Sequence, residues 1–169
     1  MSGEFERIAQ FFKPLAREPF ALGLSDDAAL LSVPAGRELV VTTDTLVAGV
    51  HFFAEDAPAD IARKALRVNL SDLAAKGASP FVYTLVLALP AAIDDRWLAA
   101  FAAALGEDQR RYDIGLIGGD MSATPGPLSI TIGAFGLVPQ GSMLKRHGAR
   151  PGVLLFVTGP IGDAALGLL

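Results

Sequence analysis

Residues 58–89 read PADIARKALRVNLSDLAAKGASPFVYTLVLAL, and this stretch decides the fold class. The part at 58–76 has Pro58 near its start and Gly77 just past its end, which is typical of a long helix. The part at 81–89 is a nearly continuous apolar run rich in β-prone residues, which predicts a buried strand. A long helix followed by a buried strand indicates helices packed on a sheet.

The segments on either side of this stretch extend the alternation of helices and strands. In order, we predict a helix over 3–13, strands over 28–33 and 38–43 joined as a hairpin, the helix over 58–76, the strand over 81–89, a helix capped by Asp94 or Asp95, and strands over 114–117 and 128–138. This order predicts an α+β fold: a mixed, mostly antiparallel sheet with helices on one face.

The length of 169 residues is enough for one domain and a piece of another. A polar, basic segment at 141–150 precedes the turn Pro151-Gly152, so we expect a first domain over 1–150 and the start of a second over 151–169. Residues 153–157 are typical of a buried strand, and 164–169 of the first turns of an apolar helix. Because those leucines need a partner, we expect the chain to be part of a longer product.

Composition excludes several classes of protein. The formal net charge of −4 argues against nucleic acid as the main partner, since phosphate backbones require a basic face. The chain has no cysteine, which excludes disulfides and thiolate metal sites and favours a reducing cytoplasm. No apolar run approaches the roughly 20 residues that span a bilayer, and the first residues lack the features of a signal peptide.

Four short acidic motifs adjoin apolar segments of the chain. They are Ser25-Asp26-Asp27, Thr42-Thr43-Asp44, Asn69-Leu70-Ser71-Asp72 and Gly118-Gly119-Asp120. An unpaired carboxylate at the edge of a core is costly, and nearby lysines and arginines are too few to pair with all of them. Hard divalent cations would satisfy such carboxylates, which points to phosphate chemistry.

Helical spacing gives Asp72 a separate argument. Ile61, Ala65, Val68 and Asp72 follow steps of 4, 3 and 4, so we expect them to share the face that packs on the sheet, with Asn69 alongside. A carboxylate in a last helical turn is also opposed by the helix dipole. A buried metal ligand explains Asp72 better than an outward-turned or capping acid.

The usual nucleotide signatures are missing. The chain has no G-x-x-x-x-G-K-[ST] and no G-x-G-x-x-G motif, which disfavours P-loop, Rossmann and protein-kinase sites. Its two histidines are far apart in sequence, so a histidine zinc site is weakly supported.

The motifs resemble, in order, those of the thiamine-monophosphate kinase family. The matching stretches are GEF at 3–5, SDDAAL at 25–30, TDTLVAGVHF at 43–52, KALRVNLSDLAAKGA at 64–78, GGD at 118–120 and VTG at 157–159. This family belongs to the superfamily of aminoimidazole ribonucleotide synthetase and selenophosphate synthetase. The resemblance covers nearly the whole chain.

The resemblance implies a kinase that uses ATP to convert thiamine phosphate to thiamine diphosphate and requires several Mg²⁺ ions. It implies magnesium ligands at Asp27, Thr42, Thr43, Asp44, Asp72 and Asp120, a substrate contact at His51, and nucleotide contacts at Gly119, Asp120 and Arg146. It also implies a homodimer that pairs through its sheets, with nucleotide near the interface. The acceptor phosphate is already ionised, so we expect no catalytic group beyond the metal ligands.

The sequence departs from the family pattern at two positions. Ser25 stands where a glycine is usual, and Met121 stands where threonine is frequent. The family's second half, which holds further acidic ligands and most thiamine contacts, lies beyond these residues, so we expect no turnover by this chain alone. Two alternatives stay open: another ATP-using enzyme of the superfamily that activates an amide or selenide, and a non-catalytic nucleotide-binding or dimerisation fragment.

Overall fold

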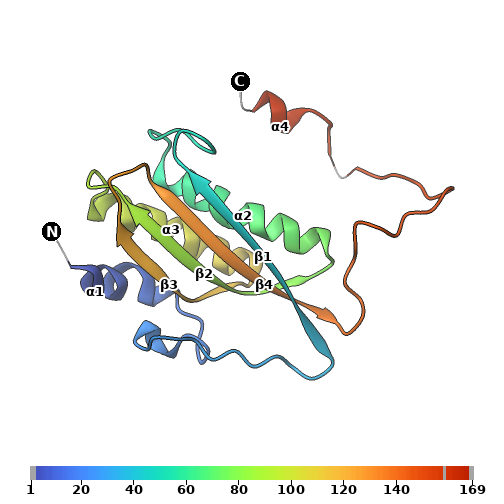
Figure 1. The fold of residues 1–169 in the computed structure, drawn as a ribbon, viewed down its shortest axis with the longest axis horizontal. Coiled ribbons are helices and arrows are strands. Elements are labelled where there is room, and N and C mark those ends of the chain that lie inside the picture. Colours follow the sequence, from blue (N-terminus) through green and yellow to red (C-terminus); the bar gives the residue numbers. More distant parts are fainter. Residues whose placement is uncertain (1–2, 158, 168–169) are drawn as a thin grey trace.

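Four strands form one sheet in the order β1-β4-β2-β3, in a computed structural model that describes residues 3–157 and 159–167 (Figure 1). The strands are β1 (Arg37–Val47), β2 (Ser79–Leu89), β3 (Gly115–Ala123) and β4 (Ser129–Pro139). β4 pairs antiparallel with both β1 and β2, and β2 pairs parallel with β3. The predicted mixed, mostly antiparallel sheet is therefore confirmed.

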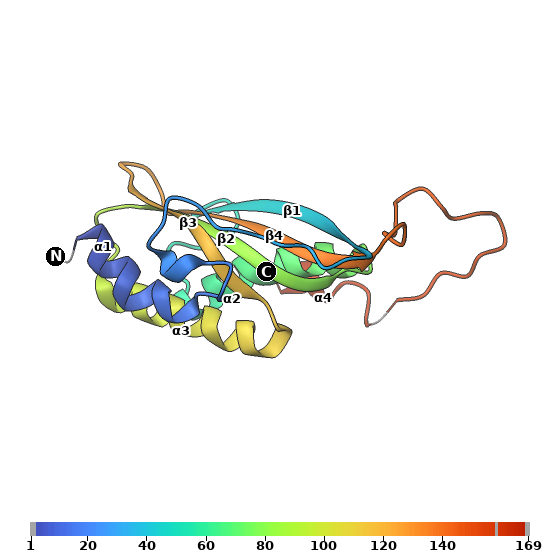
Figure 2. The same cartoon turned by 90° about the horizontal axis from the view of Figure 1, so that it is seen from below.

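Two long helices, α2 (Pro58–Ala75) and α3 (Asp95–Tyr112), cover one face of this sheet (Figure 2). The N-terminal segment lies on the same side: α1 (Glu4–Arg7) continues as a π-helical turn, Ile8–Phe12, and a 3₁₀ turn, Lys13–Leu15. The predicted cap of α3 is Asp94, whose Oδ1 accepts a hydrogen bond from the Trp97 N–H at 2.8 Å. A short helix, α4 (Asp163–Leu166), lies near the C-terminus.

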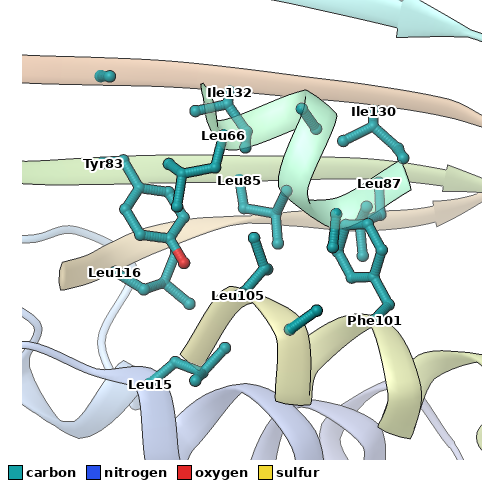
Figure 3. Packing of buried hydrophobic residues seen from close by; sticks show 14 of the residues in the cluster. Leu15, Leu66, Tyr83, Leu85, Leu87, Phe101, Leu105, Leu116, Ile130 and Ile132 are labelled. Carbon is teal, nitrogen blue, oxygen red and sulfur yellow. The ribbon is translucent and has the colours of Figure 1, made fainter. Parts of the chain in front are cut away.

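The main core lies between the sheet and these helices (Figure 3). Tyr83, Leu85 and Leu87 of β2 and Ile130 and Ile132 of β4 pack there against Phe101 and Leu105 of α3 and Leu66 of α2. Gln109 donates from Nε2 to the Tyr83 hydroxyl and to the Leu15 carbonyl, both at 3.0 Å. Burial raises the pKa of Tyr83 well above its usual value.

The predicted strand at 28–33 is wrong, and so is its hairpin with 38–43. Residues 28–33 have no regular structure, and the ladder partner of β1 is β4. The turn between them does form, because Arg37 N–H donates to the Pro34 carbonyl. Ala29 and Leu31 instead pack on the helix-free face of the sheet, against a small cluster of Phe81, Val82 and Ile117.

Two further strand predictions differ from the structure. β3 does not end at residue 117 but runs through Gly118 and Gly119 to Ala123, paired with β2 along its length. Residues 153–157, predicted as a buried strand, are exposed and lie in no strand. Thr158 of the VTG motif and residues 168–169 of the predicted last helix lie outside the described residues. Within residues 3–157 and 159–167, no helix is long and apolar enough to cross a membrane.

Candidate functional site

A pocket of about 550 Å³ lies beside β3, between the sheet and the N-terminal segment. Segments far apart in the sequence build it: the helical residues near the N-terminus, the loop at 23–27, and the neighbouring strands β2 and β3. Its lining residues are Glu4, Phe5, Ile8, Ala9, Phe12, Lys13, Gly23, Leu24, Ser25, Asp26, Asp27, Leu85, Leu87, Leu116, Gly118, Gly119, Asp120 and Met121. The pocket thus joins two of the four predicted acidic motifs.

This pocket combines an apolar lining with carboxylates. Phe12, Leu85 and Leu116 supply buried apolar surface, while Asp27 and Asp120 are exposed and line the same cavity. Apolar cavities with a few convergent polar groups are the usual form of small-molecule sites. The pocket therefore has the composition of a small-molecule site, with carboxylates among its lining residues.

Local hydrogen bonds shape the loop that carries the paired aspartates. The Ser25 hydroxyl donates to the Leu22 carbonyl at 2.8 Å, so the serine at this position closes a turn. The Asp27 N–H donates to Asp26 Oδ1 at 2.8 Å. The carboxylate of Asp26 therefore has a structural role in the loop, which supports the choice of Asp27 as the ligand.

A second pair of predicted site residues meets near the opposite edge of the sheet, where β1 is the edge strand. The Thr42 hydroxyl of β1 donates to Asp72 Oδ2 of α2 at 2.9 Å. Asp72 is exposed, so its predicted burial is wrong. The buried face of α2 passes through Ala65, Asn69 and Leu73, which places Asp72 at the rim of that face.

Thr42 and Thr43, adjacent on β1, point to opposite faces of the sheet. Side chains alternate along a strand, so Thr42 and Asp44 face α2 while Thr43 faces the helix-free side. On that side Thr43 Oγ1 lies beside Gly133 of β4, close to Thr84. In one copy of the chain, Thr43 is thus separated from the other β1 residues predicted to bind magnesium.

The sheet also separates Asp44 from Asp120. The ladder aligns Asp44 with Ile132, Ile132 with Leu85, and Leu85 with Gly119, the neighbour of Asp120. Three strand spacings of about 4.8 Å place the backbones of Asp44 and Asp120 roughly 14 Å apart. A single copy therefore presents two separate sets, one near β1 and one at the β3 pocket.

Gly119 has a structural reason to be glycine. A Cβ atom at this position would lie 1.7 Å from the Leu85 carbonyl oxygen of β2. A Cβ at Gly118 would meet nothing within 4 Å. Close approach of the two strands therefore requires Gly119, independently of any ligand.

Two other predicted contacts lie apart from the pocket. His51 is in the turn after β1, where its Nδ1 accepts a hydrogen bond from the Val47 N–H at 3.0 Å. Arg146 is exposed in the segment that follows β4, two residues after Leu144, whose N–H donates to the Lys76 carbonyl at the end of α2. The segment that carries Arg146 thus passes the C-terminal end of α2.

The donor set suits magnesium only in part. Among the residues that the structure describes, no group of three or more histidine, cysteine, aspartate or glutamate side chains could hold a metal ion. Mg²⁺ commonly takes one or two carboxylates and completes its shell with water and substrate phosphates. Asp72 beside Thr42 supplies one carboxylate, and Asp27 with Asp120 at the pocket supplies two, which is within this range.

The sequence interpretation missed some residues of these sites. Lys13 lines the pocket, and the ammonium group of Lys64 donates to the His51 carbonyl. Lys64 is part of the stretch at 64–78 that carries the resemblance, but the resemblance implied no role for Lys64. Nothing in the spacing around Lys13 pointed to a site, because the pocket forms only in the folded chain.

Comparison with known proteins supports the resemblance. The family described as AIR synthase related protein, N-terminal domain, matches residues 25–138. The thiamine-monophosphate kinase of Escherichia coli (strain K12) is 51% identical over 168 residues, which cover 98% of this chain and 51% of that protein. The chain thus spans about half the length of the curated relatives it matches.

Solved structures agree with the fold. The crystal structure of thiamine-monophosphate kinase from Stenotrophomonas maltophilia K279a matches with a TM-score of 0.70 and 47% identity, over 79% of this chain and 42% of that one. AaThiL complexed with AMPPCP and TMP matches with a TM-score of 0.65 and 28% identity, over 88% of this chain and 45% of that one. The α+β fold and the resemblance expected from the motifs are confirmed.

Proposed function

The chain belongs to the AIR synthase related family, and on this premise we propose that it forms the nucleotide-binding and magnesium-binding part of a thiamine-monophosphate kinase. The observation that carries the proposal is the 51% identity to the Escherichia coli kinase, which extends through 98% of this chain. The reaction would transfer the γ-phosphoryl group of ATP to thiamine phosphate and yield thiamine diphosphate and ADP.

The site residues take their proposed roles from this reaction. Asp27, Asp44, Asp72 and Asp120, with the hydroxyls of Thr42 and Thr43, would hold magnesium, which supplies charge neutralisation between two phosphate groups when bound. Gly119, Asp120 and Arg146 would contact ATP, and His51 would contact thiamine phosphate. The chain's own contribution is to orient both phosphates in line and to hold negative charge where the metal binds.

A homodimer is part of the proposal. The helix-free face of the sheet carries apolar side chains at its surface, with Val41 58% exposed and Val86 37% exposed. Burying them against a second copy would remove apolar surface from water. Pairing of two sheets through this face would also place Thr43 at the interface, and the roughly 14 Å between the two acidic sets supports a site completed by more than one copy of the chain.

We also propose that residues 1–150 are one domain and that residues 151–169 begin a second. The sheet ends with β4 at Pro139, and the exposed apolar residues Leu154, Leu155 and Phe156 would pack inside that second domain. The cytoplasm, where ATP is plentiful and thiols stay reduced, is the proposed location of this cysteine-free chain.

The decisive experiment joins residues 1–150 to the C-terminal half of the Escherichia coli kinase. ADP release would be measured with thiamine phosphate, with an amide and with selenide as acceptors. We expect release only with thiamine phosphate, together with formation of thiamine diphosphate. Release with another acceptor would favour a different enzyme of the superfamily.

Experiments on the 169-residue chain alone test the remaining alternative, a non-catalytic nucleotide-binding fragment. We expect the chain to bind ATP in the presence of Mg²⁺ without forming thiamine diphosphate, because it spans only about half the length of the kinases it matches. A chimera that binds ATP and also fails to turn over would support a non-catalytic binding fragment. Titration calorimetry measures the binding, and chromatography of the products measures turnover.

A further inference from the structure

The turn that follows β1 is held by a dense set of hydrogen bonds. The Val47 carbonyl accepts from the N–H groups of Val50 and His51, and Gly49 N–H donates to the Phe52 carbonyl. Gly49 has a φ of 78°, which glycine adopts without strain. Phe52 is buried in the main core and anchors the end of the turn.

The ring of His51 is part of this turn. Its Nδ1 accepts the Val47 N–H at 3.0 Å, so Nδ1 carries no proton. A neutral imidazole holds its one proton on the other nitrogen, which here is Nε2. Because His51 is exposed, this geometry presents an N–H donor at Nε2 to solvent, directed away from Val47.

Lys64 of α2 fixes the same residue from its backbone side. The Lys64 ammonium group donates to the His51 carbonyl. An ammonium group has three donor hydrogens and no acceptor, so this contact leaves two donors for water or an anion. The ring and the carbonyl of His51 are therefore each held by a separate element, β1 and α2.

We propose that Lys64 is a positioning residue for His51: together with Val47 it holds the imidazole in the Nε2–H form, aimed as a hydrogen-bond donor at a phosphate oxygen or ring nitrogen of the substrate. The substrate part of this inference rests on the proposed function. The fixed tautomer and orientation rest only on the contacts of Val47, His51 and Lys64.

The test is nuclear magnetic resonance of the 169-residue chain labelled with ¹⁵N in its histidine rings. The chain has two histidines, and His147, exposed in the segment after β4, is the internal reference for an unrestrained ring. We expect His51 to show one proton-bearing nitrogen at Nε2 and one bare nitrogen at Nδ1, and His147 to show averaged signals. Averaged signals or an Nδ1–H pattern for His51 would overturn the proposal.

Variants of Lys64 test its role. Lys64→Met keeps the length of the side chain but cannot donate, so we expect the His51 signals to shift toward the averaged pattern. Lys64→Arg can still donate and should retain the fixed pattern. Lys76→Met, at the end of the same helix, is the matched control and should leave His51 unchanged. An unaltered His51 spectrum in Lys64→Met would contradict the role of Lys64.

Two further measurements test the folding of the variants and the binding of substrate separately from the positioning of His51. The indole signal of Trp97, the chain's single tryptophan, reports whether each variant is folded, and Lys64→Leu, which also cannot donate, replaces Lys64→Met if the latter does not fold. Titration with thiamine phosphate should move the Nε2 signal of His51 in the chimera that joins residues 1–150 to the C-terminal half of the Escherichia coli kinase. A fixed ring whose signal does not move would refute the substrate role in the proposed function while upholding the positioning by Lys64.

Discussion

The hydroxyl of Thr42 donates to Asp72 Oδ2 at 2.9 Å and links β1 to the last turns of α2. The acceptor is a carboxylate close to the C-terminal end of a helix, where the partial charge of the helix is negative. Its charge therefore opposes the helix instead of stabilising it. The proposed role of Asp72 as a magnesium ligand would explain why an acid stands there.

Asp72→Asn should separate binding from stability. The amide can still accept the Thr42 hydrogen bond and removes the unfavourable charge, so we expect the free energy of unfolding to stay within about 1 kcal/mol of the original. Magnesium-dependent ATP binding should weaken at least about tenfold, which is about 1.4 kcal/mol. Calorimetry and urea unfolding give the two values. Unchanged affinity would remove Asp72 from the magnesium ligands.

Asp26 and Asp27 provide a matched pair at the pocket. Asp26 Oδ1 accepts the Asp27 N–H, whereas the Asp27 carboxylate lines the pocket without a hydrogen bond to any residue that the structure describes. We expect Asp27→Asn to weaken magnesium-dependent ATP binding about tenfold or more, and Asp26→Asn to weaken it less. The reverse order would identify Asp26 as the ligand.

Gly119→Ala should be strongly destabilising. Its Cβ would lie 1.7 Å from the Leu85 carbonyl oxygen, so β3 could not keep its distance from β2. We expect a loss of about 3 kcal/mol or more in the free energy of unfolding. The neighbouring Gly118→Ala, which meets nothing within 4 Å, is the control and should change stability by less than about 1 kcal/mol. Equal effects of the two substitutions would contradict this account.

Substitution of Arg67 and substitution of Asp108, which form an ion pair, should lower the free energy of unfolding by different amounts. Two hydrogen bonds of 2.8 Å join them, and the carboxylate is 2% exposed while the arginine side chain is 41% exposed. This hydrogen bonding raises the pKa of Arg67, so the arginine stays charged. Arg67→Met leaves a buried unpaired acid and should cost about 4 kcal/mol.

Asp108→Asn leaves an arginine that water can reach, so we expect it to cost only about 2 kcal/mol. Chemical unfolding of both variants measures the difference. A larger loss of stability in Asp108→Asn than in Arg67→Met would contradict this expectation, because it would show that water does not compensate the guanidinium group for its lost partner. Asp60→Asn, whose partner Arg63 lies on the surface of α2, is the control with little expected effect.

Because Tyr83 is buried, we expect the folded protein to lose stability at alkaline pH. Burial raises its pKa in the folded protein, whereas the unfolded chain has the ordinary value of about 10. The folded state therefore binds this proton more tightly, and stability falls as pH rises above about 10, by about 1.4 kcal/mol per pH unit. Tyr83→Phe should lose that slope. Unfolding at several pH values above 9 measures it, and identical slopes in both proteins would refute the assignment.

Much of this fold could be predicted from sequence because the relevant signals are local. Pro58, the spacing of apolar residues and the capping Asp94 define α2 and α3. The strand at 28–33 failed because its apolar residues cover the helix-free face as an irregular segment. The predicted strand over 114–117 stopped short of Gly118 and Gly119, but pairing with β2 continues the strand through them.

The candidate site was predictable only in part. Motifs identified Asp27 and Asp120, but the pocket they share also needs Phe12 and Leu85, which no spacing rule connects. Asp72 was predicted on the buried face of α2 but lies at the rim of that face. A step of four residues is more than one helical turn of 3.6 residues, so Asp72 is rotated away from the face on which Val68 lies. The Lys64–His51 contact joins a helix to a turn and is visible only in three dimensions.

The order of the strands has a consequence for synthesis of the chain. Among the strands that the structure describes, β4 comes after β1, β2 and β3 in the sequence, yet it lies between β1 and β2 in the sheet. Until residue 139 has left the ribosome, β1 has no ladder partner and the sheet cannot close. β2 can pair with β3 before that point, but the nascent chain must hold β1 without a ladder partner from residue 47 to residue 139, a stage at which chaperones and early degradation compete with folding.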